Sequence, residues 1–249
     1  MSARRFSNYL VIFKSAIVQP FLDFIFPPRC FGCDKDIDSG LVCNKCFTQI
    51  TTTALGTCSI CGIPKIREGT CKHHLGWIQS KISRIRALGL YGKPYIELIH
   101  NLKYLNKKKI AQVLGLGLTN VINSDPILSR ADFIVPIPLH SSRLRERGYN
   151  QSLLLAQEAA SGSGITINDC LIRKKNTRSQ TELDQIKRIK NINGAFTIKP
   201  KLNYSIKDKR VILIDDVMTS GTTLAEAAKV LIENGASEVY GAVVTTARI

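Results

Sequence analysis

Between residues 80 and 128, the pattern of hydrophobic and polar residues predicts regular secondary structure. A strand-like stretch, Ile82–Tyr91, comes first. Two runs follow in which apolar residues recur about every 3.6 positions, the period of an amphipathic helix. These runs contain Ile96, Leu98, Ile99, Leu102 and Leu105, and then Ile110, Val113, Leu114 and Leu118, with Lys107–Lys109 between them. The pattern predicts one strand and two helices.

After residue 130 the chain alternates between short apolar strands and helices. Arg210–Ile214 is an unbroken apolar run, which is typical of a strand buried on both faces of a parallel sheet. A helix that ends at Gly235 and another strand follow within about 35 residues, which is a βαβ unit. The fold class is therefore α/β, a parallel sheet with helices on both faces. The predicted strands are 132–138, 195–198, 210–214 and 239–245, and the predicted helices are 152–160 and 222–234.

The first 28 residues are rich in apolar side chains but do not form a membrane-spanning sequence. Lys14, Gln19, Pro20 and Asp23 interrupt the apolar run, which stays well below the ~18 residues that a transmembrane helix needs. We predict an amphipathic helix over residues 1–28, docked on the protein itself, on a partner, or in weak contact with a membrane.

Seven of the eight cysteines lie between Cys30 and Cys71, mostly as C-x-x-C pairs. In a chain of this length such pairs favour zinc over disulfides, and they indicate a reducing, cytoplasmic setting. We predict a zinc-binding module over residues 29–78 with two structural sites, although a cross-braced pairing and a lost second site remain alternatives, with His73 as a rival ligand. The two ligand sets are Cys30, Cys33, Cys43 and Cys46, and then Cys58, Cys61, Cys71 and His74.

The charge balance points to anionic partners. The chain has 35 Lys and Arg residues against 19 Asp and Glu, a net charge of +16. Such an excess favours nucleic acid, anionic lipid or phosphorylated small molecules. Aromatic residues make up only 7% of the chain, so DNA binding by base stacking is less convincing.

The segment Val211–Thr223 (VILIDDVMTSGTT) combines a buried strand, two acids, a polar turn and a helix start. Free backbone N–H groups at a helix N-terminus attract phosphate. Asp215 and Asp216 can accept hydrogen bonds from a vicinal diol or help to hold Mg²⁺. A plain helix cap needs only one such polar residue. The turn that would hold a phosphate monoester consists of Thr219, Ser220, Gly221, Thr222 and Thr223.

A second basic segment, Val135–Ser152, begins at a predicted strand. Just beyond the strand's end it carries Arg143, Arg145, Arg147, Gly148, Asn150 and Gln151. Arginine side chains bind pyrophosphate through paired N–H donors. The alternative is a solvated, basic helix start.

The run D-D-x-x-T-S-G-x-T from Asp215 to Thr223 resembles the motif with which type I phosphoribosyltransferases bind phosphoribosyl pyrophosphate (PRPP). The resemblance implies that the two acids contact the ribose hydroxyls, that Thr219–Thr223 hold the 5′-phosphate, and that Mg²⁺ accompanies PRPP. It also implies that the loop with Arg143 and Arg147 contacts the pyrophosphate, and that residues 173–196 form a loop that closes over the site. The corresponding domain is predicted over residues 79–249.

The order of motifs along the chain resembles the ComF (ComFC/GntX-like) family from about residue 20 onward. The segments are F-P-P-R-C (26–30), the cysteine pairs, Y-G-x-P (91–94), I-H-x-L-K-Y (99–104), V-P-I-P-L-H (135–140), N-x-x-G-A-F (191–196) and the PRPP motif. His74 stands where the last cysteine is usual, and Ser220 where threonine is more common. Membership implies a role in natural competence, DNA uptake or the use of DNA as a nutrient, but no particular reaction.

Two kinds of function are consistent with these features. The first is an enzyme that transfers phosphoribose from Mg-PRPP; no general base is obvious, but such sites act mainly by positioning and electrostatics. The second is a non-catalytic factor that handles single-stranded DNA along the basic runs 107–109, 173–175 and 187–190, with a repurposed nucleotide-phosphate pocket. A related alternative is docking of competence-machinery proteins through the zinc module.

Overall fold

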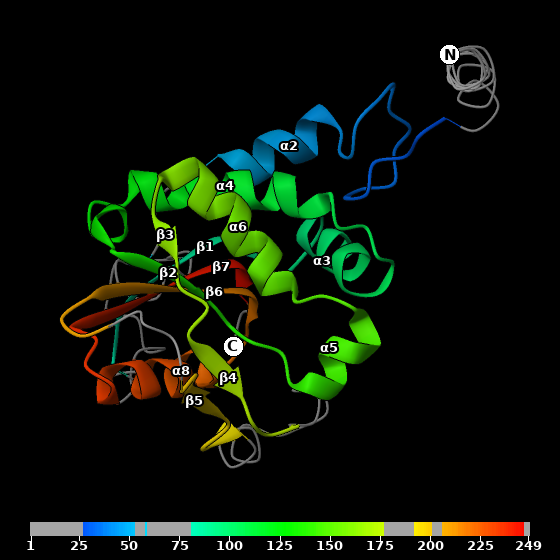
Figure 1. Ribbon diagram of the computed structural model, residues 1–249. Coiled ribbons are helices and arrows are strands. Elements are labelled where there is room, and N and C mark those ends of the chain that lie inside the picture. The colour runs from blue at the N-terminus through cyan, green and yellow to red at the C-terminus, as the bar shows by residue number, and fades with distance from the viewer. Residues whose placement is uncertain (1–26, 53–57, 59–80, 177–191, 201–205, 247–249) are drawn as a thin grey trace, which may run out of the picture.

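The computed structural model describes residues 27–52, 58, 81–176, 192–200 and 206–246. Its elements, shown in Figure 1, are α2 (Asn44–Thr51), β1 (Ile82–Leu90), α3 (Tyr95–Tyr104), α4 (Ile110–Ser124), η2 (Leu128–Arg130), β2 (Phe133–Pro136), α5 (Ser141–Arg147), α6 (Gln151–Ser163), β3 (Thr166–Ile167), β4 (Leu171–Arg173), β5 (Phe196–Ile198), β6 (Arg210–Met218), α8 (Thr222–Glu233) and β7 (Glu238–Thr246).

Five parallel strands form one sheet in the order β1-β7-β6-β2-β3. The connection β2–α6–β3 runs outward from the middle of the sheet in one direction, and β6–α8–β7 runs in the other. Because such crossovers are right-handed, the two helices cover opposite faces. Figure 1 shows α4 and α6 over one face, and α8 with the antiparallel β4–β5 pair on the other. The predicted α/β fold, a parallel sheet with helices on both faces, is confirmed.

Strand β6 is buried on both faces, as its unbroken apolar run predicts. Successive side chains of a strand point to opposite faces. Accordingly, Ile212 and Ile214 lie in the hydrophobic core that contains residues of α3, α4 and α6. Val211 and Leu213 lie in the second core, which contains residues of α8.

The prediction that β6 ends at Ile214 is wrong, because the strand continues to Met218. Its pairing with β7 runs on through Asp215 opposite Val243 and Met218 opposite Thr246. Ladder hydrogen bonds join backbone groups, so the acidic side chains do not interrupt them. The two acids therefore lie within the strand and not after it.

The helical repeat correctly predicts α3 and α4, but the structure contains short elements that the sequence pattern does not reveal. Arg143 and Arg147 lie on helix α5, and not in a loop. The strand predicted at 132–138 is shorter at both ends, since β2 covers only Phe133–Pro136.

Helix α2, from the cysteine-rich segment, packs directly on α4. Gly117 of α4 makes this approach feasible, because a Cβ atom there would lie 2.6 Å from the carbonyl oxygen of Ile50. Ile50 is 1% exposed and belongs to the core shared with the sheet. The hydroxyl of Tyr95 donates to the carbonyl oxygen of Gln49 at 3.0 Å. The cysteine-rich segment is thus fixed against the larger domain.

Some predictions concern residues outside the described ranges. Most of the helix predicted over residues 1–28 falls there, as does the boundary predicted at residue 78. Among the described residues, none of the helices has both the length and the apolar character of a membrane span.

Candidate phosphoribosyl site

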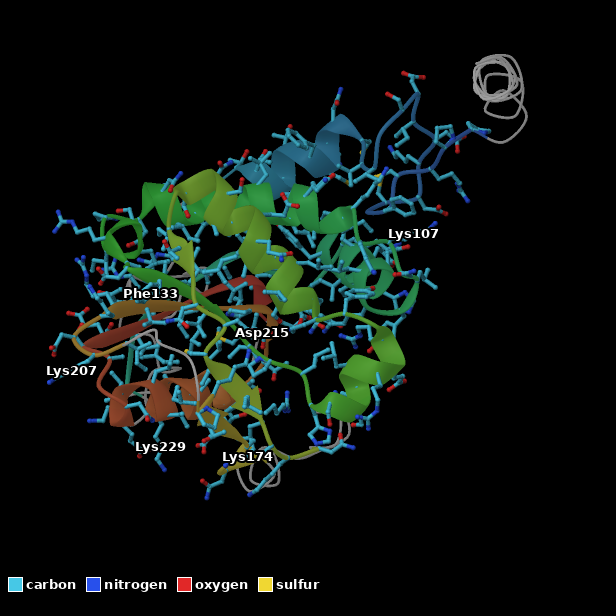
Figure 2. All side chains as sticks on the ribbon, viewed as in Figure 1. Lys107, Phe133, Lys174, Lys207, Asp215 and Lys229 are labelled. Atoms are coloured by element: carbon cyan, nitrogen blue, oxygen red, sulfur yellow. The ribbon has the colours of Figure 1, made fainter. Side chains whose placement is uncertain are left out.

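The carboxyl ends of β2 and β6 form the natural ligand-binding edge of this sheet. The two strands are neighbours, and their connections leave in opposite directions. Ligands of open α/β sheets bind at such a switch point, outside the carboxyl ends of the strands. Helix α5 follows β2 at this edge, and the turn before α8 follows β6. Figure 2 shows Asp215, in the second half of β6, near the centre of the molecule.

The turn between β6 and α8 has the conformation of an anion-binding helix start. Gly221 has a φ of 75°, in the left-handed region that glycine adopts without strain. Helix α8 begins at Thr222, and no side chain caps it at Gly221. The hydroxyls of Ser220 and Thr222 lie 3.1 Å apart. The N–H groups of the first helical turn have no partners within the helix, so they can bind a phosphate.

The two adjacent acids have different surroundings. Asp215 Oδ1 accepts hydrogen bonds from Ser152 Oγ at 3.0 Å and from the backbone N–H of Asp216 at 2.9 Å. Asp216 is 3% exposed. Its Oδ1 accepts from Gln151 Nε2 at 3.0 Å, and its Oδ2 forms an ion pair with Lys103 Nζ. Both oxygens of Asp216 are therefore occupied by protein groups.

These surroundings shift the pKa values in opposite directions. Burial and the neighbouring charge of Asp216 raise the pKa of Asp215 to about 7. Burial would also raise the pKa of Asp216, but the Lys103 ammonium and the hydrogen bonds from Lys103 and Gln151 hold it below its ordinary value. Burial would lower the pKa of Lys103, yet the attraction of Asp216 raises it. The Lys103–Asp216 pair is thus charged, whereas Asp215 titrates near neutral pH.

A cavity of about 360 Å³ opens over these acids. Among the described residues, four cationic side chains from α3, α5 and β4 surround it and outnumber the two acids. One wall is apolar and aromatic. The cations are Lys103, Arg143, Arg147 and Arg173, and the apolar wall includes Tyr91, Ile96, Ile99 and Tyr104.

A second cavity of about 600 Å³ adjoins the first and shares four of its lining residues, among them Lys103 and Arg147. It extends to Lys108, whose Nζ lies 4.7 Å from the centroid of the Tyr149 ring. Glu146 is the only acidic residue that lines it within the part of the chain that the structure describes. The two cavities together form a hollow that suits a ligand with several phosphate groups.

The structure brings most of the predicted phosphoribosyl-site residues together. Asp215, Asp216, Thr219 and Thr223 line the first cavity. Arg143 and Arg147 line both cavities, and Gly148, which ends α5 with a φ of 79°, lines the second. Ser220, Gly221 and Thr222 form the turn beside them.

Asn150 has a different place from the other predicted pyrophosphate-loop residues. It caps α6 by accepting from the N–H of Ser152 at 3.1 Å and donates to the carbonyl oxygen of Ile137 at 3.0 Å. Its side chain thus fixes the short connection between α5 and α6. The predicted closing loop, residues 173–196, is described only at its ends, where Arg173 in β4 lines the first cavity.

Sequence reasoning missed Lys103 and Ser152 as site residues, whereas Gln151 belongs to the predicted pyrophosphate segment and Arg173 begins the predicted closing loop. A signal for Lys103 does exist, because it lies four positions after buried Ile99 and continues the buried stripe of α3. A lysine in such a stripe needs a charged partner, since an unpaired buried charge is very costly.

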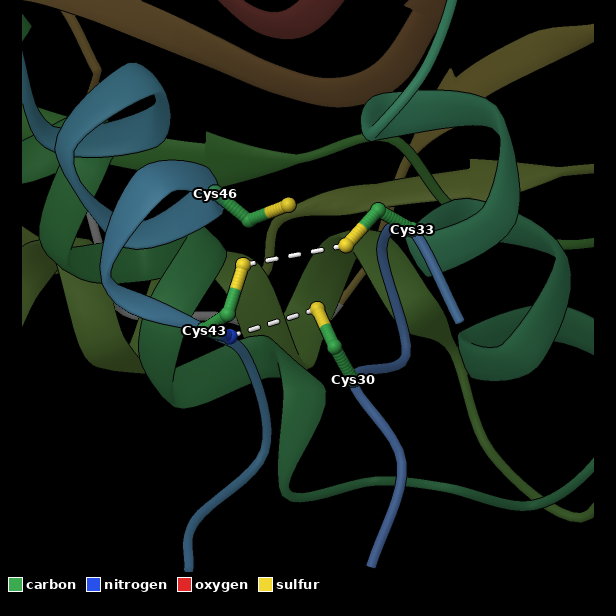
Figure 3. A group of neighbouring side chains, drawn as sticks. All are labelled: Cys30, Cys33, Cys43 and Cys46. Carbon is green, nitrogen blue, oxygen red and sulfur yellow. Dashed lines mark hydrogen bonds between the residues drawn. The ribbon is translucent and has the colours of Figure 1, made fainter. Parts of the chain in front are cut away.

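The cysteine-rich segment gathers the first set of four thiols. The sulfur atoms of Cys30, Cys33, Cys43 and Cys46 all lie within 4.8 Å of one another (Figure 3). A tetrahedral Zn²⁺ with Zn–S bonds of ~2.3 Å needs sulfur atoms ~3.8 Å apart. The observed distance between the sulfurs of Cys33 and Cys43 is 3.7 Å. The donor set therefore fits zinc, and it joins the first two cysteine pairs without cross-bracing.

The backbone prepares Cys30 to be a thiolate. Its sulfur accepts N–H hydrogen bonds from Gly32 at 3.4 Å and from Cys43 at 3.2 Å. Burial raises its pKa, but the backbone hydrogen bonds outweigh burial and lower it to about 7. Of the second predicted set, Cys58 is buried. The other members, Cys61, Cys71 and His74, and the rival His73, lie outside the described residues.

Comparison with known proteins fits this geometry. The family described as a double zinc ribbon domain matches residues 21–75, and the phosphoribosyl transferase domain matches residues 150–248. Competence protein F of Haemophilus influenzae is 30% identical over 215 residues, which are 84% of this chain and 86% of the relative. This chain belongs to the ComF family. The DNA utilization protein YhgH of Escherichia coli K12 is 30% identical over 224 residues, 86% of this ComF chain and 94% of the relative.

More distant similarities involve solved phosphoribosyltransferases. The glutamine PRPP amidotransferase of Bacillus subtilis has a TM-score of 0.38 and 20% identity, over 58% of this ComF chain and 30% of that chain. The adenine phosphoribosyltransferase of Leishmania donovani has a TM-score of 0.37 and 12% identity, over 59% of this chain and 68% of that chain. The predicted family, the phosphoribosyltransferase-type domain and the zinc-ribbon module are confirmed.

Proposed function

We propose that this ComF protein binds PRPP with Mg²⁺ at the carboxyl end of β6 and transfers its phosphoribosyl group during DNA uptake or utilisation. The observation that carries the proposal is the continuous sequence of strand, paired acids, left-handed Gly221 and uncapped helix α8, facing a cavity lined by four cations. Each part suits one part of PRPP.

The 5′-phosphate would bind the turn 219–223, where helix N–H groups and hydroxyls converge. The ribose hydroxyls would donate to the acids of β6. The pyrophosphate would meet Arg143, Arg147 and Arg173. Bound Mg²⁺ would neutralise part of the pyrophosphate charge as it leaves. The protein's contribution is to orient the two reactants and to stabilise charge, which together lower the barrier of a loose transition state.

The test is calorimetric titration of the zinc-loaded protein with PRPP and Mg²⁺. A double variant, Asp215→Asn with Asp216→Asn, is expected to bind at least tenfold more weakly, because each amide lacks the negative charge and one of the two acceptor oxygens of the carboxylate. Asp208→Asn is the matched control, since Asp208 is an exposed acid just before the N-terminal end of β6, away from the proposed site. A well-folded wild-type protein that binds no PRPP at millimolar concentration would refute the proposal.

The four-thiol set supports a structural zinc. A closed set of four protein ligands leaves no open position for catalysis. Whether one or two ions bind depends on the second set, so zinc content per chain is the measurement: two ions are expected if His74 or His73 completes that set. Thiolate ligands need a reducing compartment, which supports the cytoplasm as the site of action.

A second candidate function, binding of single-stranded DNA, is favoured by one specific feature. Lys108 lines the second cavity and lies over the ring of Tyr149, and the neighbouring Lys107 lies over the ring of Phe31. In a chain of net charge +16 these lysines suit a phosphate backbone. Fluorescence anisotropy with an oligonucleotide should show affinity that falls steeply with salt. Replacing both lysines by glutamine should reduce the log–log slope by about 1 to 2; an unchanged slope would contradict this role.

A further inference from the structure

Lys103 occupies a position that the strand–turn–helix motif does not include. It comes from α3, and its side chain is 19% exposed. It pairs with Asp216 and lines both cavities. The ammonium group therefore lies between the acids of β6 and the cationic hollow beside α5.

The ion pair makes the two acids unequal. Asp216 also lines the cavity, but each of its carboxylate oxygens already holds a protein group, Gln151 or Lys103, with which a ribose hydroxyl would have to compete. Removing one partner of a buried ion pair is strongly unfavourable, since it leaves an uncompensated charge. The hydrogen bonds that Asp215 accepts from Ser152 Oγ and from the backbone N–H of Asp216 both fall on Oδ1, and Asp215 lines the cavity, so Oδ2 is the oxygen that a ligand would meet.

The ammonium keeps donors for a ligand as well. A lysine ammonium has three N–H donors, and the contact with Asp216 Oδ2 uses one of them. The remaining two are available on the side where Lys103 borders the cavities with Arg143 and Arg147. A dianionic group placed there would meet three cations from two helices.

We propose that Lys103 binds the pyrophosphate group of the ligand, that Asp216 is a positioning residue that holds Lys103, and that Asp215 alone takes the ribose hydroxyls. This inference rests on the proposed function and deepens it. It divides the ligand between separate protein groups, so the two halves of PRPP can be tested one at a time.

The experiment is titration of the zinc-loaded protein, with Mg²⁺ present, with PRPP, with inorganic pyrophosphate and with ribose 5-phosphate. Lys103→Met is expected to weaken pyrophosphate binding about 10- to 100-fold, the value of a charged hydrogen bond. Its affinity for ribose 5-phosphate should stay within about threefold, because no ribose contact is lost. Asp215→Asn should show the opposite selectivity. Asp216→Asn should follow Lys103→Met, since an amide no longer holds the ammonium in place.

Two further variants keep the test decisive. Lys103→Met leaves Asp216 buried without its counter-charge, so the double variant Lys103→Met with Asp216→Asn removes both charges and protects folding. It should also lose pyrophosphate and keep ribose 5-phosphate. Lys93→Met is the matched control, because Lys93 precedes α3, is 70% exposed and lines neither cavity; it should bind all three ligands like the wild type.

Clear results would overturn the inference. If Asp216→Asn loses ribose 5-phosphate as Asp215→Asn does, Asp216 contacts the ribose and the division is wrong. Equal losses for both fragments in the double variant would mean that Lys103 only supports the fold. A wild type that binds PRPP, with Lys103→Met binding it equally well, refutes the inference but leaves the proposed function intact. A wild type that binds no PRPP refutes both.

Discussion

Asp215 should make the protein less stable as the pH rises, and replacing it by asparagine should remove that dependence. Burial and the neighbouring charge of Asp216 raise the pKa of the Asp215 carboxyl in the folded protein from 3.8 to about 7. The substituted asparagine would keep the acceptor that binds Ser152 Oγ and the N–H of Asp216, because the amide oxygen can take the place of Oδ1. The substitution therefore removes charge with little change in shape.

The direction of this pH dependence follows from the number of protons that the folded and unfolded states bind. Between pH 3.8 and about 7 the folded state holds a proton on Asp215 that the unfolded state has released. Stability from this group is therefore greatest at acidic pH and is lost as the pH rises through the folded pKa. The limiting loss is ~4 kcal/mol at 1.36 kcal/mol per pKa unit. Between pH ~5.5 and ~8.5 the stability of the wild type should fall by about 2 kcal/mol relative to Asp215→Asn.

Urea denaturation of both proteins at several pH values, with zinc present throughout, measures this difference directly. Taking the difference between the two proteins cancels the titration of all groups that the substitution leaves unperturbed. At pH ~8.5 the variant should be the more stable protein. A difference in unfolding free energy that is independent of pH would refute the reasoning, because it would mean that Asp215 is ionised throughout this range.

Three further predictions concern the rest of the molecule. Cys43→Ser should lower the zinc content by one ion per chain by atomic emission, whereas Cys170→Ala, at a cysteine outside the thiol cluster, should leave it unchanged. Gly117→Ala should cost ~1–3 kcal/mol in urea denaturation because its Cβ would meet the backbone of α2. Gly92→Ala should be near neutral, because its Cβ would lie 3.9 Å from the carbonyl oxygen of Leu90, an ordinary contact. Asp125→Asn should cost ~3 kcal/mol at neutral pH, because it leaves two arginines without their carboxylate. Burial raises the pKa of Asp125, but backbone and arginine hydrogen bonds outweigh burial and lower it. The cost of the substitution should therefore shrink as the pH falls through this lowered pKa of the folded state.

The sequence predicts those parts of the fold whose signal is local. The apolar run of Arg210–Ile214 predicts a buried central strand because a parallel sheet covered on both faces demands it. The cysteine spacing predicts the thiol cluster because two short knuckles bring four sulfurs together. Helix α5 could not be predicted in this way. None of its seven residues is buried, so it has no apolar stripe, and only its caps at His140 and Gly148 mark it.

The contact between Lys103 and Asp216 could not be predicted from spacing, because it joins α3 to a strand far along the chain. The motif alone treats the two acids as equals, since it places them after the strand, where side chains have no fixed face. Their position within β6 makes the two acids unequal. Alternate residues of a strand share a face, so Asp216 continues the series of Ile212 and Ile214 toward the core of α3, α4 and α6. The side chains that meet it come from the helices on that side, α3 and α6. The extension of β6 by four residues is thus the physical reason why one acid of the pair is committed to the protein.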